Sequence, residues 1–123
     1  MTATRALGQV GEDLAAAHLV ASGLVVLHRN WRCALGDVRG EIDLIARDGD
    51  ILVIVEVKAR RGVATGGPLV AVTWRKQQQL RRLASVWLST TGIRAREVRF
   101  DVVGVSWPPG GGPARIDHVR GVC

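Results

Sequence analysis

The fold is decided by Gly40-Glu41-Ile42-Asp43-Leu44-Ile45-Ala46-Arg47-Asp48-Gly49-Asp50-Ile51-Leu52-Val53-Ile54-Val55-Glu56-Val57-Lys58. Two runs rich in Ile and Val flank Asp48-Gly49, a pair typical of the tight turn of a β-hairpin. The stretch therefore predicts two antiparallel strands. A hairpin this apolar is typical of a core, yet four charged side chains interrupt it: Glu41, Asp43, Glu56 and Lys58.

Strand periodicity predicts that these charges share one face. Alternate side chains of a strand point the same way, so Glu41 goes with Asp43, and Glu56 goes with Lys58. With Asp48-Gly49 as the loop, the register sets Glu41 opposite Glu56. A four-residue loop gives the same register. A three-residue loop would instead turn Glu56 to the other face of the sheet. Like charges opposite each other destabilise a sheet, and a divalent cation would offset them.

The acids and the lysine also form a motif. Asp43, twelve further residues and then Glu56-x-Lys58 resemble the active-site pattern of the PD-(D/E)XK nuclease superfamily, which has the restriction-endonuclease-like fold. The chain as a whole, over about residues 8 to 105, resembles the YraN-like family of small bacterial proteins. The blocks that carry this resemblance are Gly8-x-x-Gly11-Glu12-x-x-Ala15, Asn30-Trp31-Arg32, Gly40 to Ala46, Val55-Glu56-Val57-Lys58-x-Arg60, Lys76 and Arg99-Phe100-Asp101.

The predicted fold class is α/β, a restriction-endonuclease-like sandwich whose central mixed sheet is flanked by helices in the order αβββαβ. Apolar periodicity, β-branched runs and glycine positions predict the elements. We expect one domain over residues 1–123, with its core at about 7–105 and a loop and tail at 106–123. The predicted elements are helices at 7–22 and 73–89, strands at 24–31 and 97–105 beside the hairpin, and a last edge strand at 114–119.

The resemblance implies a metal site. It makes Asp43 and Glu56 ligands of Mg²⁺ or Mn²⁺, and gives Lys58 the part of orienting or deprotonating a water molecule and stabilising the transition state. Glu12 resembles the helix-borne glutamate that some nucleases of the superfamily add to the metal shell. The alternative for Glu12 is a first-turn acid that complements the helix dipole. Glu41 either interacts with the metal ligands without binding the metal itself or is simply the first residue of its strand.

Basic residues flank the acids and predict phosphate contacts. Arg60 and Arg61 fall in a basic, glycine-rich loop expected at 59–68. Lys76 and Gln77 flank the apolar stripe of the second helix, one turn before it begins, and we expect them to reach toward the site. A solvated Lys76 that keeps its ammonium group in water is the alternative.

Composition favours a polyanionic partner. The chain has 17 Lys and Arg against 11 Asp and Glu, a net charge of +6, so nucleic acid is the expected partner. The longest purely apolar run, residues 51–55, is too short to cross a bilayer, and the first residues hold no apolar signal segment. Cys33 and Cys123 show no zinc or redox spacing. We therefore expect a cytoplasmic protein without a membrane partner.

The remaining polar and aromatic residues have structural interpretations. Cys33 to Arg39 is expected to be a loop. Asp101 is either an acid that supports the metal ligands or a buried acid paired with a nearby arginine, and we favour the ion pair. The three histidines, His18, His28 and His118, are expected to be surface residues without a catalytic part. Trp31 is either a base-stacking platform or a lid on the core.

These observations predict a metal-dependent nuclease that hydrolyses phosphodiester bonds in DNA rather than RNA, with branched repair or recombination intermediates among the candidate substrates. Cutting two strands symmetrically would need a homodimer. One alternative is a nucleic-acid-binding or scaffold protein that keeps the nuclease fold without turnover. The other is a purely structural interpretation, in which Lys58 and Arg47 neutralise the acids as ion pairs.

Overall fold

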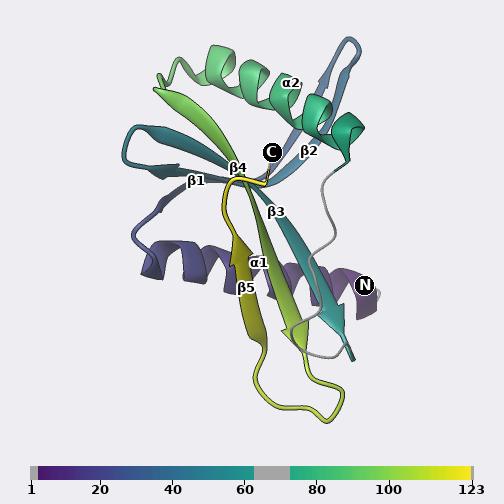
Figure 1. The fold of residues 1–123 in the computed structure, drawn as a ribbon. Coiled ribbons are helices and arrows are strands. Elements are labelled where there is room, and N and C mark those ends of the chain that lie inside the picture. Colours follow the sequence, from purple (N-terminus) through teal and green to yellow (C-terminus); the bar gives the residue numbers. More distant parts are fainter. Residues whose placement is uncertain (1–2, 63–72, 123) are drawn as a thin grey trace.

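The computed structural model describes residues 3–62 and 73–122 as two helices and a five-stranded sheet. The strands lie in the order β1-β2-β3-β4-β5, with β3 and β4 parallel and the other neighbours antiparallel. Helices α1 and α2 cover opposite faces of the sheet (Figure 1), so the predicted α/β sandwich with a mixed sheet is confirmed. The elements are α1 (Ala3–Ala21), β1 (Val25–Leu35), β2 (Val38–Asp48), β3 (Ile51–Arg61), α2 (Trp74–Thr91), β4 (Glu97–Trp107) and β5 (Arg115–Val119).

Each helix has its own apolar core against one face of the sheet. On β3 the alternation of side chains is regular, so Val53 and Val55 pack under α1 while Leu52 and Ile54 pack under α2. Complete burial of such a side chain contributes about 1.5–3 kcal/mol. The predicted apolar stripe of α2 is confirmed by its four buried residues, Leu80, Leu83, Ala84 and Trp87. Trp31 packs against the α2 core, as the lid interpretation predicted. Within the described ranges, no helix combines the length and apolarity of a membrane span.

Both helices are longer than their sequence patterns predicted. Helix α1 begins at Ala3 rather than near residue 7, and the chain leaves it through Gly23, whose φ of 93° suits a residue without a Cβ. Helix α2 extends to Thr91 and ends at Gly92 with φ of 73°. Its N-cap is Thr73, whose hydroxyl accepts a hydrogen bond from the backbone N–H of Lys76. The cap therefore aligns the first turn, which carries Lys76.

The loop predicted from Cys33 to Arg39 is wrong, because most of it is strand. Strand β1 continues to Leu35, which pairs with Val38 across a two-residue turn. The turn begins at Gly36, whose φ of 61° fits the turn class with glycine first. The result is a long β1–β2 hairpin that extends past the N-terminal end of α2 (Figure 1).

The central hairpin has a different turn from the predicted one. Its loop is Gly49-Asp50, with φ of 62° at Gly49, so Asp48 pairs with Ile51. This choice moves the register by two residues, and the predicted pairing of Glu41 with Glu56 is wrong. The β2–β3 ladder ends at Leu44 and Val55. Beyond it β2 pairs only with β1, and β3 only with β4. We call the place where β2 and β3 separate the fork.

The loop predicted at residues 59–68 is also wrong in its first part. Strand β3 continues through Arg61, because each residue up to that point pairs with β4. Residues 63–68 of the predicted loop lie outside the described residues. The expected last strand at 114–119 is confirmed as β5, which pairs with β4.

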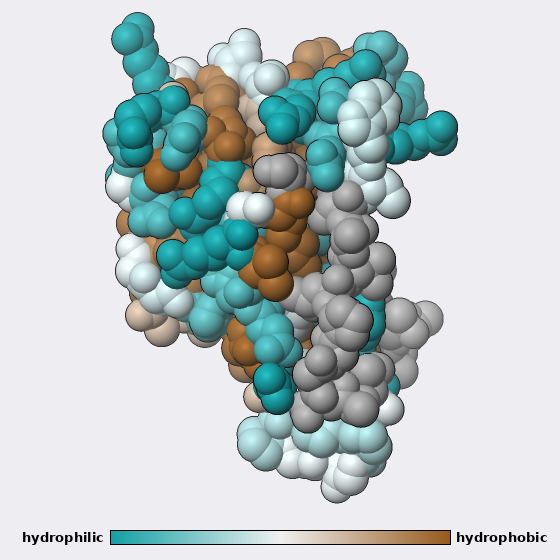
Figure 2. Space-filling model, viewed as in Figure 1, coloured by the Kyte–Doolittle hydropathy of each residue, from teal (hydrophilic) through white to brown (hydrophobic). Residues whose placement is uncertain are grey.

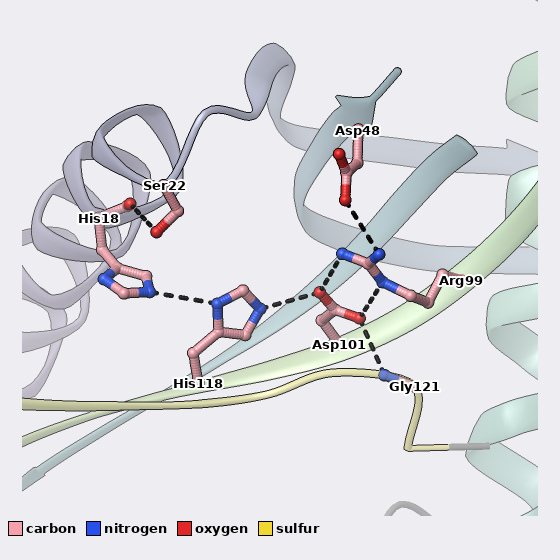
Figure 3. A network of polar contacts seen from close by, with 7 residues as sticks. All are labelled: His18, Ser22, Asp48, Arg99, Asp101, His118 and Gly121. Atoms are coloured by element: carbon pink, nitrogen blue, oxygen red, sulfur yellow. Dashed lines mark hydrogen bonds and ion pairs between the residues drawn. The ribbon is translucent and has the colours of Figure 1, made fainter. Parts of the chain in front are cut away.

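A buried polar network joins α1, β4 and β5 (Figure 3). Asp101 is 1% exposed and accepts hydrogen bonds from Arg99 at 2.9 and 3.1 Å, which confirms its predicted ion pair. His118 Nε2 lies 2.8 Å from Asp101 Oδ2, and His118 Nδ1 lies 3.1 Å from His18 Nε2. Burial raises the pKa of Asp101, but the bonds from Arg99 and His118 outweigh it and hold that pKa below its usual value. The side chain of His118 is only 7% exposed, so its prediction as a surface residue is wrong.

Candidate functional site

The fork brings two of the predicted acids to the same level. Asp43 and Glu56 each come one residue beyond the last pair of the β2–β3 ladder, Leu44 with Val55. Asp43 Oδ2 accepts a hydrogen bond of 2.8 Å from the backbone N–H of Val57. That N–H faces β2 and has no strand partner there, so the carboxylate of Asp43 takes the place that a β2 carbonyl holds further down the ladder. Asp43 therefore lies in the fork, not on a flat sheet face.

Burial and neighbouring acids together raise the pKa of Asp43. Burial, the largest cause, raises its pKa to about 6 from the usual 3.8, against the opposing effect of the Val57 hydrogen bond. Repulsion from Glu56, Glu12 and Glu41 raises it further. All four carboxylates are thus close enough to interact electrostatically, although they come from α1, β2 and β3. A carboxyl group with a pKa of about 6 still carries a proton on about a tenth of the molecules at about pH 7.

Two lysines from different elements approach Glu56. Lys58 Nζ lies 3.9 Å from Glu56 Oε1, and Lys76 Nζ lies 3.7 Å from Glu56 Oε2. Lys58 comes from the same strand, whereas Lys76 reaches over from the first turn of α2. The predicted approach of Lys76 to the site is therefore confirmed. Both distances exceed those of direct hydrogen bonds, so the ammonium groups attract Glu56 without being fixed to it.

Glu12 reaches the fork from the α1 side. Helix α1 has no acidic residue in its first turn, so the interpretation of Glu12 as a first-turn acid is wrong. Its Oε1 is buried and has no hydrogen-bond partner. Burial is the main reason that its pKa is raised, while a hydrogen bond from Asn30 and the charge of Arg29 oppose the rise. Gly11 permits this approach, because a Cβ there would lie 2.7 Å from Ala59 Cβ on β3.

Sequence reasoning missed the role of Asn30 in this arrangement. Asn30 has φ of 53° and, within residues 3–62 and 73–122, is the only residue besides glycines with a positive φ. Asparagine tolerates this left-handed conformation better than most residues. The β1–β2 ladder keeps one register from Arg29 to Trp31 but has no pair at Asn30, whose amide instead meets Glu12. An asparagine inside a predicted strand, just before Trp31, was the available signal.

Glu41 belongs to the hairpin rather than to the fork. Its carboxylate accepts a hydrogen bond of 3.0 Å from Arg32, and its side chain is 39% exposed. Glu41 therefore acts on Asp43 only through its charge.

The predicted phosphate-binding residues follow β3 and α2 away from the fork. Arg60 is two residues after Lys58 and faces the same side of β3, whereas Arg61 is exposed on the other side. Gln77 is partly buried on α2, next to Lys76. The structure thus brings Lys76 to the carboxylates and places the two arginines further along the strand.

The described part of the chain contains no group of three or more His, Cys, Asp and Glu side chains that could hold a metal ion as it stands. Each acid has a protein partner instead: Asp43 has the Val57 N–H, Glu56 has two ammonium groups and Glu12 has Asn30. The donors nevertheless fit Mg²⁺ or Mn²⁺ in kind, because they are carboxylate oxygens. The Oε1 of Glu12 is buried without a hydrogen-bond partner, and burial raises the pKa of Asp43, so the charge of both carboxylates is poorly compensated and a cation would offset it.

Comparisons with known proteins agree with the resemblance to the YraN-like family of small bacterial proteins. The model of the uncharacterised protein family UPF0102 matches residues 11–105. A UPF0102 protein of a Nocardioides species is 51% identical over 118 residues, covering 96% of this chain and 91% of the relative. One from Streptomyces coelicolor is 50% identical, covering 100% and 92%. One from Clavibacter michiganensis is 46% identical over the full length of both chains.

Proposed function

The chain belongs to the UPF0102 family, and we propose that it is a metal-dependent nuclease that hydrolyses phosphodiester bonds in DNA in the cytoplasm. The observation that carries the proposal is the fork. There, carboxylates from three elements, Glu12, Asp43 and Glu56, approach one another together with the ammonium groups of Lys58 and Lys76. Acids that crowd together in this way cost stability unless they serve a cation or a reaction.

Asp43, Glu56 and Glu12 would hold the Mg²⁺ or Mn²⁺. When bound, such an ion lowers the pKa of a water molecule and polarises the scissile phosphate. Glu56 must exchange its lysine partners for the cation. That exchange costs little, because the ammonium groups lie 3.7 and 3.9 Å away and are more than a third exposed.

The exchange leaves two cationic groups available to the substrate. Lys58 and Lys76 approach Glu56 from β3 and from α2, so their ammonium groups would stand on two sides of a phosphate at the fork. From there they would stabilise the negative charge that develops on phosphoryl oxygens, and Lys58 would orient the attacking water or, as the neutral amine, help to deprotonate it. Arg60, Arg61 and Gln77 would bind neighbouring phosphates.

Calorimetric titration of Mg²⁺ and Mn²⁺ into the wild type and Glu56→Ala tests the proposal, together with incubation of labelled branched and linear DNA. Metal binding and cleavage should both vanish in Glu56→Ala. The matched control is Glu97→Ala, which removes an exposed carboxylate at the start of β4 and should keep both activities. Cleavage by Glu56→Ala at the wild-type rate would refute the assignment.

A binding protein without turnover is the second candidate. The pairing of Glu56 with two lysines, and the lack of a ready group of metal ligands in the described part of the chain, favour it. This alternative predicts salt-sensitive DNA binding with no heat of metal binding and no cut product.

A further inference from the structure

A groove runs between the β1–β2 hairpin and the N-terminal end of α2. Its volume is about 580 Å³, and its walls come from the hairpin turn, Thr73 and the first turns of α2. Most of the residues that line it are polar or charged. Hydrophilic residues also cover the upper right of Figure 2, where the start of α2 and the hairpin lie in Figure 1. Of the residues that meet at the fork, only Lys76 also lines the groove.

The groove combines positive charge with an exposed aromatic ring. Four cationic side chains line it, against one acid, Asp37. Trp74, also in its lining, is 74% exposed, although a tryptophan normally buries most of its ring. Trp87, further along the same helix, is only 2% exposed. The cationic residues of the groove are Arg39, Arg75, Lys76 and Arg82.

We propose that this groove binds single-stranded DNA, with a base stacked on Trp74 and phosphates on the surrounding cations. Rows of cations beside an exposed aromatic ring are the usual means of holding a single strand. A duplex does not fit this chemistry, because its bases are stacked on one another and present only their edges in the grooves. The volume suits a nucleotide or two rather than a double helix.

Lys76 connects the groove with the fork. It lines the groove, and its Nζ lies 3.7 Å from Glu56 Oε2. A strand held on Trp74 would therefore continue directly to the carboxylates. The inference rests on the proposed function in that it names the substrate of that site: a single-stranded region or overhang, fed to the fork from the α2 side.

Binding is measured without turnover, by fluorescence anisotropy of labelled oligothymidylate and of a blunt duplex of equal length, in EDTA. The wild type should bind the single strand more tightly than the duplex. Trp74→Ala should weaken oligothymidylate binding about tenfold, because it removes the ring on which a base stacks. Trp74→Phe should keep most of the affinity, because its aromatic ring can still stack on a base. Trp74 is exposed, so both variants should fold.

Charge variants test the phosphate contacts. Arg82→Ala should reduce the slope of log affinity against log salt by about 0.7, the value for one phosphate of a single strand. The matched control is Arg94→Ala, which removes an exposed cation beyond the end of α2 and outside the groove, and should leave affinity and slope nearly unchanged.

The outcomes separate this inference from the proposed function. Single-strand binding that depends on Trp74, and that Glu56→Ala retains, supports the groove even if no variant cuts DNA. Three results would refute single-strand binding at the groove, whether or not DNA is cleaved. They are tighter binding of the duplex than of the single strand, binding by Trp74→Ala as tight as by the wild type, and displacement of the strand by polyglutamate at equal charge.

Discussion

Replacing Asp43 by asparagine should stabilise the protein at neutral and higher pH. The folded state raises the pKa of Asp43 to about 6 from 3.8, so the fold disfavours its ionised form. Each pKa unit corresponds to about 1.36 kcal/mol, and the difference of about two units gives a cost of about 3 kcal/mol once the group is ionised in both states. Asparagine removes the charge and can still accept the hydrogen bond from Val57.

The sign of the pH dependence follows from the same two pKa values. Below pH 3.8 the carboxyl group is protonated in the folded and the unfolded chain, so wild type and Asp43→Asn should be equally stable. Between pH 3.8 and about 6 the unfolded chain loses its proton first, and the wild type loses stability as the pH rises. Above about 6 the variant should be more stable by about 2–3 kcal/mol.

Urea denaturation followed by circular dichroism in EDTA, from about pH 4 to about pH 8, measures this difference. The control is Glu97→Gln, an exposed acid at the start of β4, whose stability should follow the wild type at every pH. Mg²⁺ should then stabilise the wild type but not Asp43→Asn, because the cation offsets the same charge. A variant that is less stable than the wild type by the same amount at all pH values would refute the reasoning.

Two further substitutions test how the fold carries the fork. Asp101→Ala should destabilise the protein by about 3–5 kcal/mol in urea denaturation, because it leaves Arg99 and His118 without their buried partner; a loss below about 1 kcal/mol would contradict the network. Gly11→Ala should lower both stability and metal affinity, since the new Cβ would lie 2.7 Å from Ala59 Cβ and push α1 away from β3. Gly11→Ala combined with Ala59→Gly should recover both stability and metal affinity. If the double variant does not recover them, the contact does not position Glu12.

Local patterns in the sequence predicted much of the fold. The strands near the centre of the sheet, the apolar stripe of α2 and the last strand at β5 all follow from periodicity. The reach of Lys76 toward the acids follows from its place beside that stripe, one turn before it begins. These features could be predicted because each depends on side chains only a few residues apart.

The turns could not be predicted in the same way. Asp48-Gly49 and Gly49-Asp50 both put a glycine in a two-residue loop, and only pairing with the neighbouring strands selects the second. The loop expected at Cys33 to Arg39 became strand because β1 and β2 support each other along their whole length. His118 was mistaken for a surface residue because its partners, His18 and Asp101, are distant in the sequence.

The sequence by itself determined which residues are available for chemistry at the site, since acids and a lysine within an apolar hairpin are costly in any fold. Only the tertiary structure decided how they meet. The β2–β3 ladder ends after Leu44 and Val55, and this separation opens the fork to Glu12 from α1 and to Lys76 from α2. The physical reason is that strand pairing and helix packing join residues far apart in the chain, and no local pattern encodes where that pairing stops.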